Sequence, residues 1–481
     1  MNLADGMNIA PLERRLTPAD QLCFIHLPKT AGSTFTAILD AQFHVQSICP
    51  EPHHVADLYP EAIATPPAEL REFLTRFNLV RGHFGYSEID PVLTQPLYLT
   101  MLRDPVDRVI SVYEFFKRAR ERGQAETADY QTLMDATADG LLAFVQHPNP
   151  VVRLRTSNFQ TRQLSEYAPE WTDCSDAERL ASAQHTLNQF VFAGLTERFH
   201  ESVLLLSYIF GWYPVVEYQN LRVVSKQPRR DGVPATVIDA IATQNQLDLE
   251  LYQQAKTRFE AQFVEMQQAL QTRYPHPPAK PEKSDTASAM LLARLEQHYA
   301  HRYAEQHGDR VEAIDFDFRQ PLSGMGWHRR NGKFNGLRLD TMGFRWTGPG
   351  TLSTLDFPLS PTLDYTLSLH IVRSAAPDIL DSLTVSVNDQ TIDMARILQD
   401  GDLVLLKGVV PQAALVSNRP FVRLCLAVNR TLPLTSVRQG SADARLVGLA
   451  IQRIQMFPVA PRPSIGQRFI QKIRHSLFPS R

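Results

Sequence analysis

The sequence predicts an α/β domain, with a parallel sheet flanked by helices, followed by a C-terminal antiparallel β-sandwich domain. Short apolar strands alternate with helical stretches up to about residue 274, as a parallel sheet covered by helices requires. A proline-rich segment follows, and beyond about residue 310 the apolar residues recur at every second position, which is typical of antiparallel strands. The 481 residues are about three times the usual length of one domain, so more than one hydrophobic core is expected.

Composition limits the class of protein. Hydrophobic residues make up 43% of the chain and charged residues 21%, values typical of soluble globular proteins and not of disordered, fibrous or coiled-coil chains. The 49 Lys and Arg residues nearly balance the 51 Asp and Glu residues, which gives a formal net charge of −2. Such a balance produces no overall field that attracts nucleic acid or an anionic membrane. Any anion-binding site must therefore be local.

The cysteines and the apolar segments indicate the compartment. The four cysteines lie far apart in the sequence, at Cys23, Cys49, Cys174 and Cys425, which is a poor framework for disulfides and favours a reducing compartment. The N-terminus has no apolar stretch of signal-peptide length, and the longest apolar run, Val203–Trp212, is about half a membrane span. We therefore expect a cytoplasmic protein without a transmembrane anchor.

The α/β part contains four candidate buried strands, at Leu22–Leu27, Leu79–Arg81, Tyr98–Leu102 and Phe190–Ala193. Helices are expected between and after them, at about Ser33–Phe43, from Pro105 onward, at Glu201–Phe210 and at Thr236–Tyr274. The helix that follows the third strand has the clearest start, because Asp104 is a favourable N-cap and Pro105 is favourable at the first helical position. Its apolar residues have helical spacing and should face the sheet: Val106, Val109, Ile110, Tyr113 and Phe116.

The C-terminal part shows strict alternation of apolar and polar residues in three segments. These are Tyr365–Ile371, Leu383–Val387 and Val422–Val428. Turn-forming pairs separate such segments, as at Asn388–Asp389. This pattern predicts antiparallel strands with one buried face.

The chain is therefore divided into four parts. Residues 1–274 form the α/β domain, 275–309 a proline-rich linker and a helix, 310–458 the β-sandwich, and 459–481 a basic amphipathic tail. On a helix the tail would place its apolar residues on one face, which suits weak contact with the inner face of a membrane. A frayed tail or a helix docked on the protein fits the same pattern.

Two strand-to-helix junctions carry the chemistry. The first, Pro28–Thr34, joins small residues, one lysine and several hydroxyls at a helix N-terminus, where backbone N–H groups and the helix dipole bind phosphate. The lysine precedes the glycine, so this is not a Walker A loop. The second junction has Arg103 at the strand end and Ser111 about two helical turns later. Arg103 suits a phosphate, although Arg103 and Arg108 also fit surface ion pairs.

Together the junctions resemble the sulfotransferases that use 3′-phosphoadenosine-5′-phosphosulfate (PAPS), in particular the heparan sulfate 2-O type of carbohydrate sulfotransferase and its bacterial relatives. That family has PKT-A/G-x-S/T for the 5′-phosphosulfate and RDP-x-x-R-x-x-S-x-Y for the 3′-phosphate, and both motifs stand here in the same order. Three further segments look similar: Arg81–Tyr86, Asn158–Leu164 and Gly194–Phe199. The resemblance covers residues 20–270 and assigns the 5′ end to Lys29, Thr30, Gly32, Ser33 and Thr34, and the 3′-phosphate to Arg103 and Ser111.

The resemblance also implies a fold and a reaction. The fold is a P-loop-like parallel sheet, the sulfotransferase fold, and the reaction is in-line transfer of a sulfuryl group from PAPS, as co-substrate, to a hydroxyl of a carbohydrate or glycolipid. Such a transfer needs a base for the hydroxyl proton and a cation at the leaving oxygen. His83, which follows the second strand, suits the base, and Lys29 suits the cation. No metal is expected.

Other polar and aromatic clusters have less specific interpretations. Cys49, Glu51, His53 and His54 lie close in sequence, but such a loop cluster is more often solvated than bound to metal. Trp327 and Trp346 fit either a sugar-stacking surface or the core of the β-sandwich.

Two other functions remain open from the sequence. A P-loop-type phosphotransferase would share the phosphate-binding logic but should carry Gly-Lys-Ser/Thr after a glycine loop. A non-catalytic glycan-binding protein would use the β-sandwich and keep a degenerate nucleotide domain.

Overall fold

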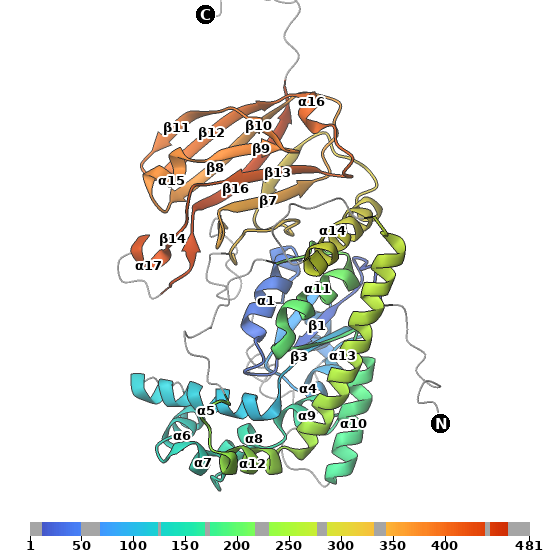
Figure 1. Ribbon diagram of the computed structural model, residues 1–481, viewed down its shortest axis with the longest axis vertical. Coiled ribbons are helices and arrows are strands. Elements are labelled where there is room, and N and C mark those ends of the chain that lie inside the picture. Colours follow the sequence, from blue (N-terminus) through green and yellow to red (C-terminus); the bar gives the residue numbers. More distant parts are fainter. Residues whose placement is uncertain are drawn as a thin grey trace, which may run out of the picture.

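The computed structural model describes residues 12–49, 68–123, 127–168, 174–216, 230–276, 286–330, 343–437 and 443–459. Most of the proline-rich segment and of the basic tail lies outside these ranges, as do Glu51, His53 and His54. Figure 1 shows a unit of helices around a small sheet, with the C-terminal strands grouped at one end of it. Among the described residues, no helix is both long and apolar enough to cross a membrane.

The N-terminal unit is built on a four-stranded parallel sheet in the order β2-β1-β3-β4. The strands are β1 (Leu22–Ile25), β2 (Leu79–Gly82), β3 (Leu97–Leu102) and β4 (Phe192–Leu195). Ile25 at the end of β1 pairs with Gly82 on one side and Thr100 on the other. This confirms the predicted strands and the parallel sheet. Since parallel strands end at one edge, the loops after β1, β2 and β3 meet there.

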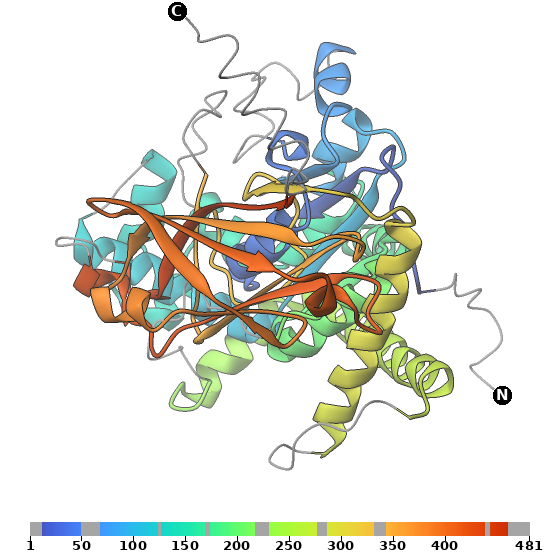
Figure 2. The same cartoon turned by 90° about the horizontal axis from the view of Figure 1, so that it is seen from above.

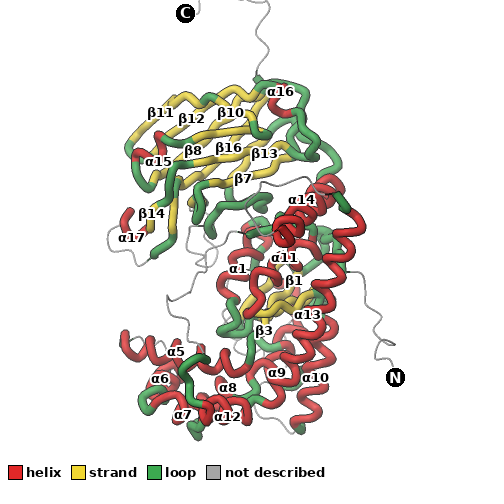
Figure 3. Tube along the Cα trace, in the orientation of Figure 1, coloured by secondary structure: helices red, strands yellow, loops and turns green. Residues whose placement is uncertain are grey.

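Helices surround this sheet, as the tube in Figure 3 shows by colour. The main ones, in chain order, are α1 (Gly32–Ala41), α3 (Ala68–Leu74), α4 (Tyr86–Ile89), α5 (Pro105–Arg122), α6 (Ala128–Asp135), α7 (Gly140–Val145), α8 (Pro150–Thr156), α9 (Phe159–Leu164), α10 (Asp176–Gln189), α11 (Phe199–Phe210), α12 (Ala235–Gln244), α13 (Gln246–Arg273) and α14 (Thr286–Gln306). The long helical region predicted at Thr236–Tyr274 is thus two helices. They divide at the buried Asn245, whose amide donates to the carbonyl oxygens of Thr156 and Ile241, both at 2.8 Å.

The C-terminal part consists of antiparallel strands, as the alternation predicted. Of the two larger sheets, one has the order β10-β9-β13-β7 and the other has β11-β12-β8-β16-β5, with β6 paired to β16. Their bounds are β5 (Ile314–Asp317), β6 (Arg345–Trp346), β7 (Leu352–Phe357), β8 (Tyr365–Ser374), β9 (Thr384–Val387), β10 (Gln390–Ile392), β11 (Met394–Asp400), β12 (Leu403–Val410), β13 (Val422–Ala427) and β16 (Leu449–Pro458). Buried residues of both sheets, such as Leu369 and Leu424, belong to one apolar cluster. Seen from above in Figure 2, these strands lie over the N-terminal unit.

Helix α14 contacts both parts of the protein. Leu295 belongs to the core around the parallel sheet, while Tyr299 and Tyr303 pack with Phe421 of the C-terminal part. The Tyr299 hydroxyl also donates to a carboxylate oxygen of Asp356 at 3.1 Å. The helix expected after the linker is therefore a packed element between the two sheet systems. The predicted domain boundaries themselves stay a prediction.

A second connection holds the C-terminal end of α1. The guanidinium of Arg330 donates to the carbonyl oxygens of Asp40 at 2.7 Å and Phe43 at 2.6 Å. The backbone N–H of Leu322 donates to the Ala41 carbonyl at 2.8 Å. The last carbonyls of a helix lack intrahelical donors and carry partial negative charge, so a cation there is stabilising. Burial lowers the pKa of Arg330 to about 10, and the side chain remains a cation at neutral pH.

One buried ion pair in the C-terminal part gives a stability prediction. Arg423 forms two hydrogen bonds of 2.7 Å to the carboxylate of Asp356, which is 4% exposed. Burial raises the pKa of Asp356 in spite of this partner. Arg423→Ala should lower the free energy of unfolding by about 3–5 kcal/mol, because it leaves a buried carboxylate without its cation. Urea unfolding followed by circular dichroism measures the change.

The matched control is Arg373→Ala. Arg373 pairs with Asp402 at 3.3 Å, but both side chains are at least half exposed, so stability should stay close to that of the wild type. Equal effects of the two substitutions would contradict the role given to the Arg423–Asp356 pair.

Candidate functional site

The loop between β1 and α1 has an unusual backbone. Lys29 and Ala31 both have positive φ, at 73° and 61°, a conformation that residues other than glycine seldom adopt. Ala31 occupies the N-cap of α1 without a side-chain hydrogen bond, and the first turn contains no acidic residue. The first N–H groups of a helix lack intrahelical acceptors. Left-handed residues at alternate positions of a turn bring N–H groups together into an anion-binding concavity. The backbone of this loop thus has the form that is typical of anion-binding turns.

Two residues, Thr30 and Gly32, hold this loop in place. The buried Thr30 hydroxyl donates to the Leu27 carbonyl at 2.7 Å and so closes the turn. Gly32 lies under the imidazole of His26, because a Cβ atom at this position would stand 1.9 Å from His26 Nε2. Only glycine allows this approach. Ser33 is partly exposed, whereas Thr34 is buried at the start of α1.

The Lys29 ammonium lies over an aromatic ring. Its Nζ atom is 4.4 Å from the centroid of Phe115, which belongs to α5. A cation at this distance is attracted to the face of the ring. This contact connects the first junction to the helix of the second.

The second junction has the predicted helix start. Asp104 Oδ1 accepts from the N–H groups of Val106 at 3.0 Å and Asp107 at 3.1 Å, and Pro105 is the first residue of α5. Ser111 lies in the same helix with 7% of its surface exposed. The Asp104 N-cap fixes where Arg103, one residue before it, leaves the strand.

Arg103 joins the two junctions. Its Nη1 atom donates to the Lys29 carbonyl at 3.2 Å, and Gln160 holds its backbone through bonds of 3.0 Å and 2.8 Å to the N–H and carbonyl groups. Burial lowers the pKa of Arg103. Among the described residues, its buried Nε atom has no hydrogen-bond partner. The guanidinium therefore reaches the first loop with donor capacity to spare.

The imidazole of His26 lies between His83 and the first loop. The ring centroid of His83 is 4.1 Å from that of His26, the residue that covers Gly32. His83 Nδ1 is 2.7 Å from the His26 carbonyl oxygen. A carbonyl can only accept, so Nδ1 carries the proton, and in the neutral ring the lone pair is on Nε2. The carbonyl contact therefore leaves this His in the tautomer that accepts a proton through Nε2.

Nearby carboxylates have structural contacts. Glu88 accepts from the Gly85 N–H group in the capping box of α4. Asp90 accepts from the Tyr98 hydroxyl at 2.8 Å. These contacts reduce the availability of either group as the base that His83 is predicted to be.

His26 and Phe115 lie outside the short motifs and meet the predicted residues only through tertiary contacts. Gln160 lies in the similar segment Asn158–Leu164 and Arg108 in the second motif, but the sequence did not indicate their contacts. Arg108 is fully buried instead of forming a surface ion pair: Nη2 donates to the Arg155 carbonyl at 2.6 Å, and the guanidinium lies 4.5 Å from the Phe159 ring. Burial lowers its pKa to about 9. The helical spacing of Arg108 and Ser111 is the signal that could have placed Arg108 on the buried face.

The remaining sequence-based candidates are distributed elsewhere. Within the described ranges, no cluster of three or more His, Cys, Asp or Glu side chains is placed to hold a metal ion. Cys49 is buried, which raises the pKa of its thiol to about 12. Trp346 is a core residue with 2% exposure. Trp327 is only half-buried and lies where the C-terminal part meets α1.

A comparison with protein families finds a match in the N-terminal part of the chain. Residues 14–220 match the model of the sulfotransferase family. No curated protein matches the chain. Among solved structures, a family GH115 4-O-methyl-α-glucuronidase with specificity for decorated arabinogalactans aligns at 11% identity and a TM-score of 0.19, over 72% of this chain and 41% of that one. The matched residues 14–220 contain both junctions and His83, and they support a sulfotransferase family for the N-terminal part of this chain.

Proposed function

We propose that the protein transfers a sulfuryl group from PAPS to a hydroxyl of a carbohydrate or glycolipid acceptor in the cytoplasm, as the resemblance to heparan sulfate 2-O-type sulfotransferases implies. The observation that carries this proposal is the hydrogen bond of 3.2 Å from Arg103 to the Lys29 carbonyl. It joins two anion-binding junctions that are 74 residues apart in the sequence. A donor with phosphate groups at both ends requires two such sites at one edge of a sheet.

The two junctions divide the donor between them. The N–H groups at the start of α1, with Lys29, Thr30, Gly32, Ser33 and Thr34, would hold the 5′-phosphosulfate. Arg103 and Ser111 would hold the 3′-phosphate, for which a guanidinium provides paired donors. This division explains why the site should prefer a 3′,5′-bisphosphate to a nucleotide with one phosphate.

The transfer uses the chain's own groups. The acceptor oxygen forms a bond to sulfur as the bond from sulfur to the 5′-phosphate oxygen breaks, and adenosine 3′,5′-bisphosphate leaves. His83 Nε2 takes the acceptor proton, in the tautomer set by the His26 carbonyl. Lys29 stabilises the negative charge that develops on the leaving phosphate oxygen.

The first prediction concerns nucleotide preference. Adenosine 3′,5′-bisphosphate should stabilise the wild type against heat more than AMP does, and Arg103→Ala should remove most of this difference. Loss of a charged hydrogen bond of about 1.5–3 kcal/mol corresponds to a decrease of about 10- to 100-fold in bisphosphate affinity. Thermal shift and calorimetric titration with both nucleotides measure it.

The control for this measurement is Arg118→Ala. Arg118 lies on the same helix α5 and pairs with Glu114 at 4.0 Å, away from both junctions in sequence, so bisphosphate affinity should not change. Equal thermal shifts of the wild type with bisphosphate and AMP would exclude the assignment of the 3′-phosphate to Arg103.

The second prediction concerns the base. His83→Ala should slow sulfuryl transfer by about 10²- to 10⁴-fold, the usual contribution of general base catalysis, while bisphosphate affinity stays near that of the wild type. Transfer is measured with labelled PAPS and pooled glycan acceptors.

His185→Ala serves as the comparison, because His185 is an exposed residue of α10 that bonds to Gln189. It should transfer sulfate at the wild-type rate. If His83→Ala also kept that rate, the base would be another residue, and Glu88→Gln would be tested next.

A further inference from the structure

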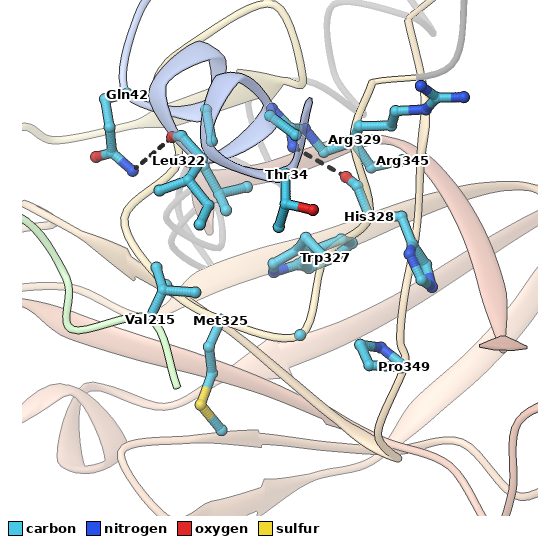
Figure 4. A pocket seen from close by; sticks show the side chains of 15 residues that line it. Thr34, Gln42, Val215, Leu322, Met325, Trp327, His328, Arg329, Arg345 and Pro349 are labelled. Carbon is cyan, nitrogen blue, oxygen red and sulfur yellow. Dashed lines mark hydrogen bonds between the residues drawn. The ribbon is translucent and has the colours of Figure 1, made fainter. Parts of the chain in front are cut away.

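A cavity of about 70 Å³ lies between α1 and the C-terminal part (Figure 4). One wall is a single face of α1, formed by Thr34, Ala37, Ile38, Ala41 and Gln42. The facing wall comes from a loop of the C-terminal part that includes Trp327, His328 and Arg329, together with Arg345 of β6. The cavity thus exists only where the two parts meet.

The cavity begins beside the predicted donor site. Thr34 is both a residue of the predicted 5′-phosphosulfate loop and a wall residue of the cavity. In Figure 4 its side chain points toward Trp327. A molecule in this cavity would therefore lie along α1, next to the end of the helix where the sulfuryl group is expected.

Of the described residues, two arginines and no acid line the cavity. The arginines are Arg329 and Arg345. Arg345 is only 2% exposed. Its Nη1 atom donates to the His328 carbonyl at 2.9 Å, and its Nε atom has no hydrogen-bond partner among the described residues. A buried guanidinium with an unused donor is costly unless an anion joins it.

The neighbouring groups do not neutralise Arg345. Asp40 is the nearby acid that acts on it, but both carboxylate oxygens of Asp40 accept from Arg81, at 2.5 Å and 2.8 Å. His328 adds no second cation, because burial lowers its pKa to about 4. Arg330, whose charge also acts on Arg345, donates to the carbonyls at the end of α1.

Trp327 offers a rigid aromatic surface to the same cavity. Its indole N–H donates to the Thr354 carbonyl at 2.9 Å, and its ring packs 4.8 Å from that of Phe318. These contacts fix the ring, while the residue remains half-buried. A fixed indole suits the apolar face of a sugar ring.

We propose that this cavity binds an acidic saccharide, with the sugar ring against Trp327 and its anionic group on Arg345. This inference rests on the proposed function, for which it places the acceptor in a site made by both parts of the protein. The anionic group is a carboxylate or a sulfate ester, since both present the same charged oxygens to a guanidinium.

The test uses defined oligosaccharides as probes and does not require transfer. The probes are unsulfated chondroitin oligosaccharides, the same oligosaccharides with carboxylates reduced to alcohols, and sulfated chondroitin oligosaccharides with carboxylates reduced. Saturation-transfer NMR with the full chain should give at least tenfold tighter binding of one charged probe than of the uncharged one. The charged probe that binds identifies carboxylate or sulfate as the group recognised.

Two variants locate the site. Arg345→Met keeps the volume of the side chain and should weaken binding of the charged probe by about 10- to 100-fold. Gln42→Glu adds a negative charge to the α1 wall without removing a buried group, and it should weaken binding in the same direction. Arg396→Ala, an exposed residue of β11 that pairs with Asp381, should bind the charged probe as the wild type does.

The same variants distinguish a failure of the cavity proposal from a failure of the proposed function. Adenosine 3′,5′-bisphosphate affinity is measured in the same variants and should stay within about twofold of the wild type. Equal binding of charged and uncharged probes, no binding of either charged probe, or wild-type binding by both Arg345→Met and Gln42→Glu would overturn the cavity proposal. The wild type could bind the charged probe, lose this binding in both variants, and yet fail to bind the bisphosphate. That outcome would support the cavity proposal and reject the sulfotransferase function.

Discussion

The parallel pairing of β1 with both of its neighbours is the constraint on which the site depends. Because Ile25 pairs with Gly82 and with Thr100, the three following loops leave the sheet at one edge. His83 can then reach the His26 carbonyl, and Arg103 can reach that of Lys29. A change of register by one residue would turn these side chains to the other face. The contacts between the junctions therefore depend on backbone hydrogen bonds that contain no catalytic group.

Helix α1 links the C-terminal part of the protein to the loop that follows β1. Its N-cap residue makes no side-chain hydrogen bond and its first turn contains no acid, whereas its last carbonyls are bound by Arg330. The paired Asp40 and Arg81 lie beside the same end. A helix held firmly at its C-terminus presents its N-terminal N–H groups at a fixed position, which reduces the reorganisation needed to bind a phosphate. The C-terminal part thereby supports the loop at the other end of α1.

The sequence predicted the features that depend on local chemistry. The buried strands, the start of α5 at Asp104 and Pro105, and the alternation of the C-terminal strands all follow from residue types at short spacing. The break between α12 and α13 did not, because Asn245 makes its decisive bond to Thr156, 89 residues away. His26 and Phe115 were missed for the same reason, since no short pattern brings them to Gly32 and Lys29.

The bond between Arg330 and α1 has a consequence for the order in which the chain is made. Asp40 precedes Arg330 by 290 residues, so α1 is synthesised long before the side chain that completes its C-terminal end. During translation its last carbonyls are bonded to water, and the wall that carries Trp327 and Arg345 does not yet exist. Contacts over such a separation form late, because they must overcome the entropy of closing a long loop. The growing chain thus completes the support of helix α1 only as the C-terminal strands fold.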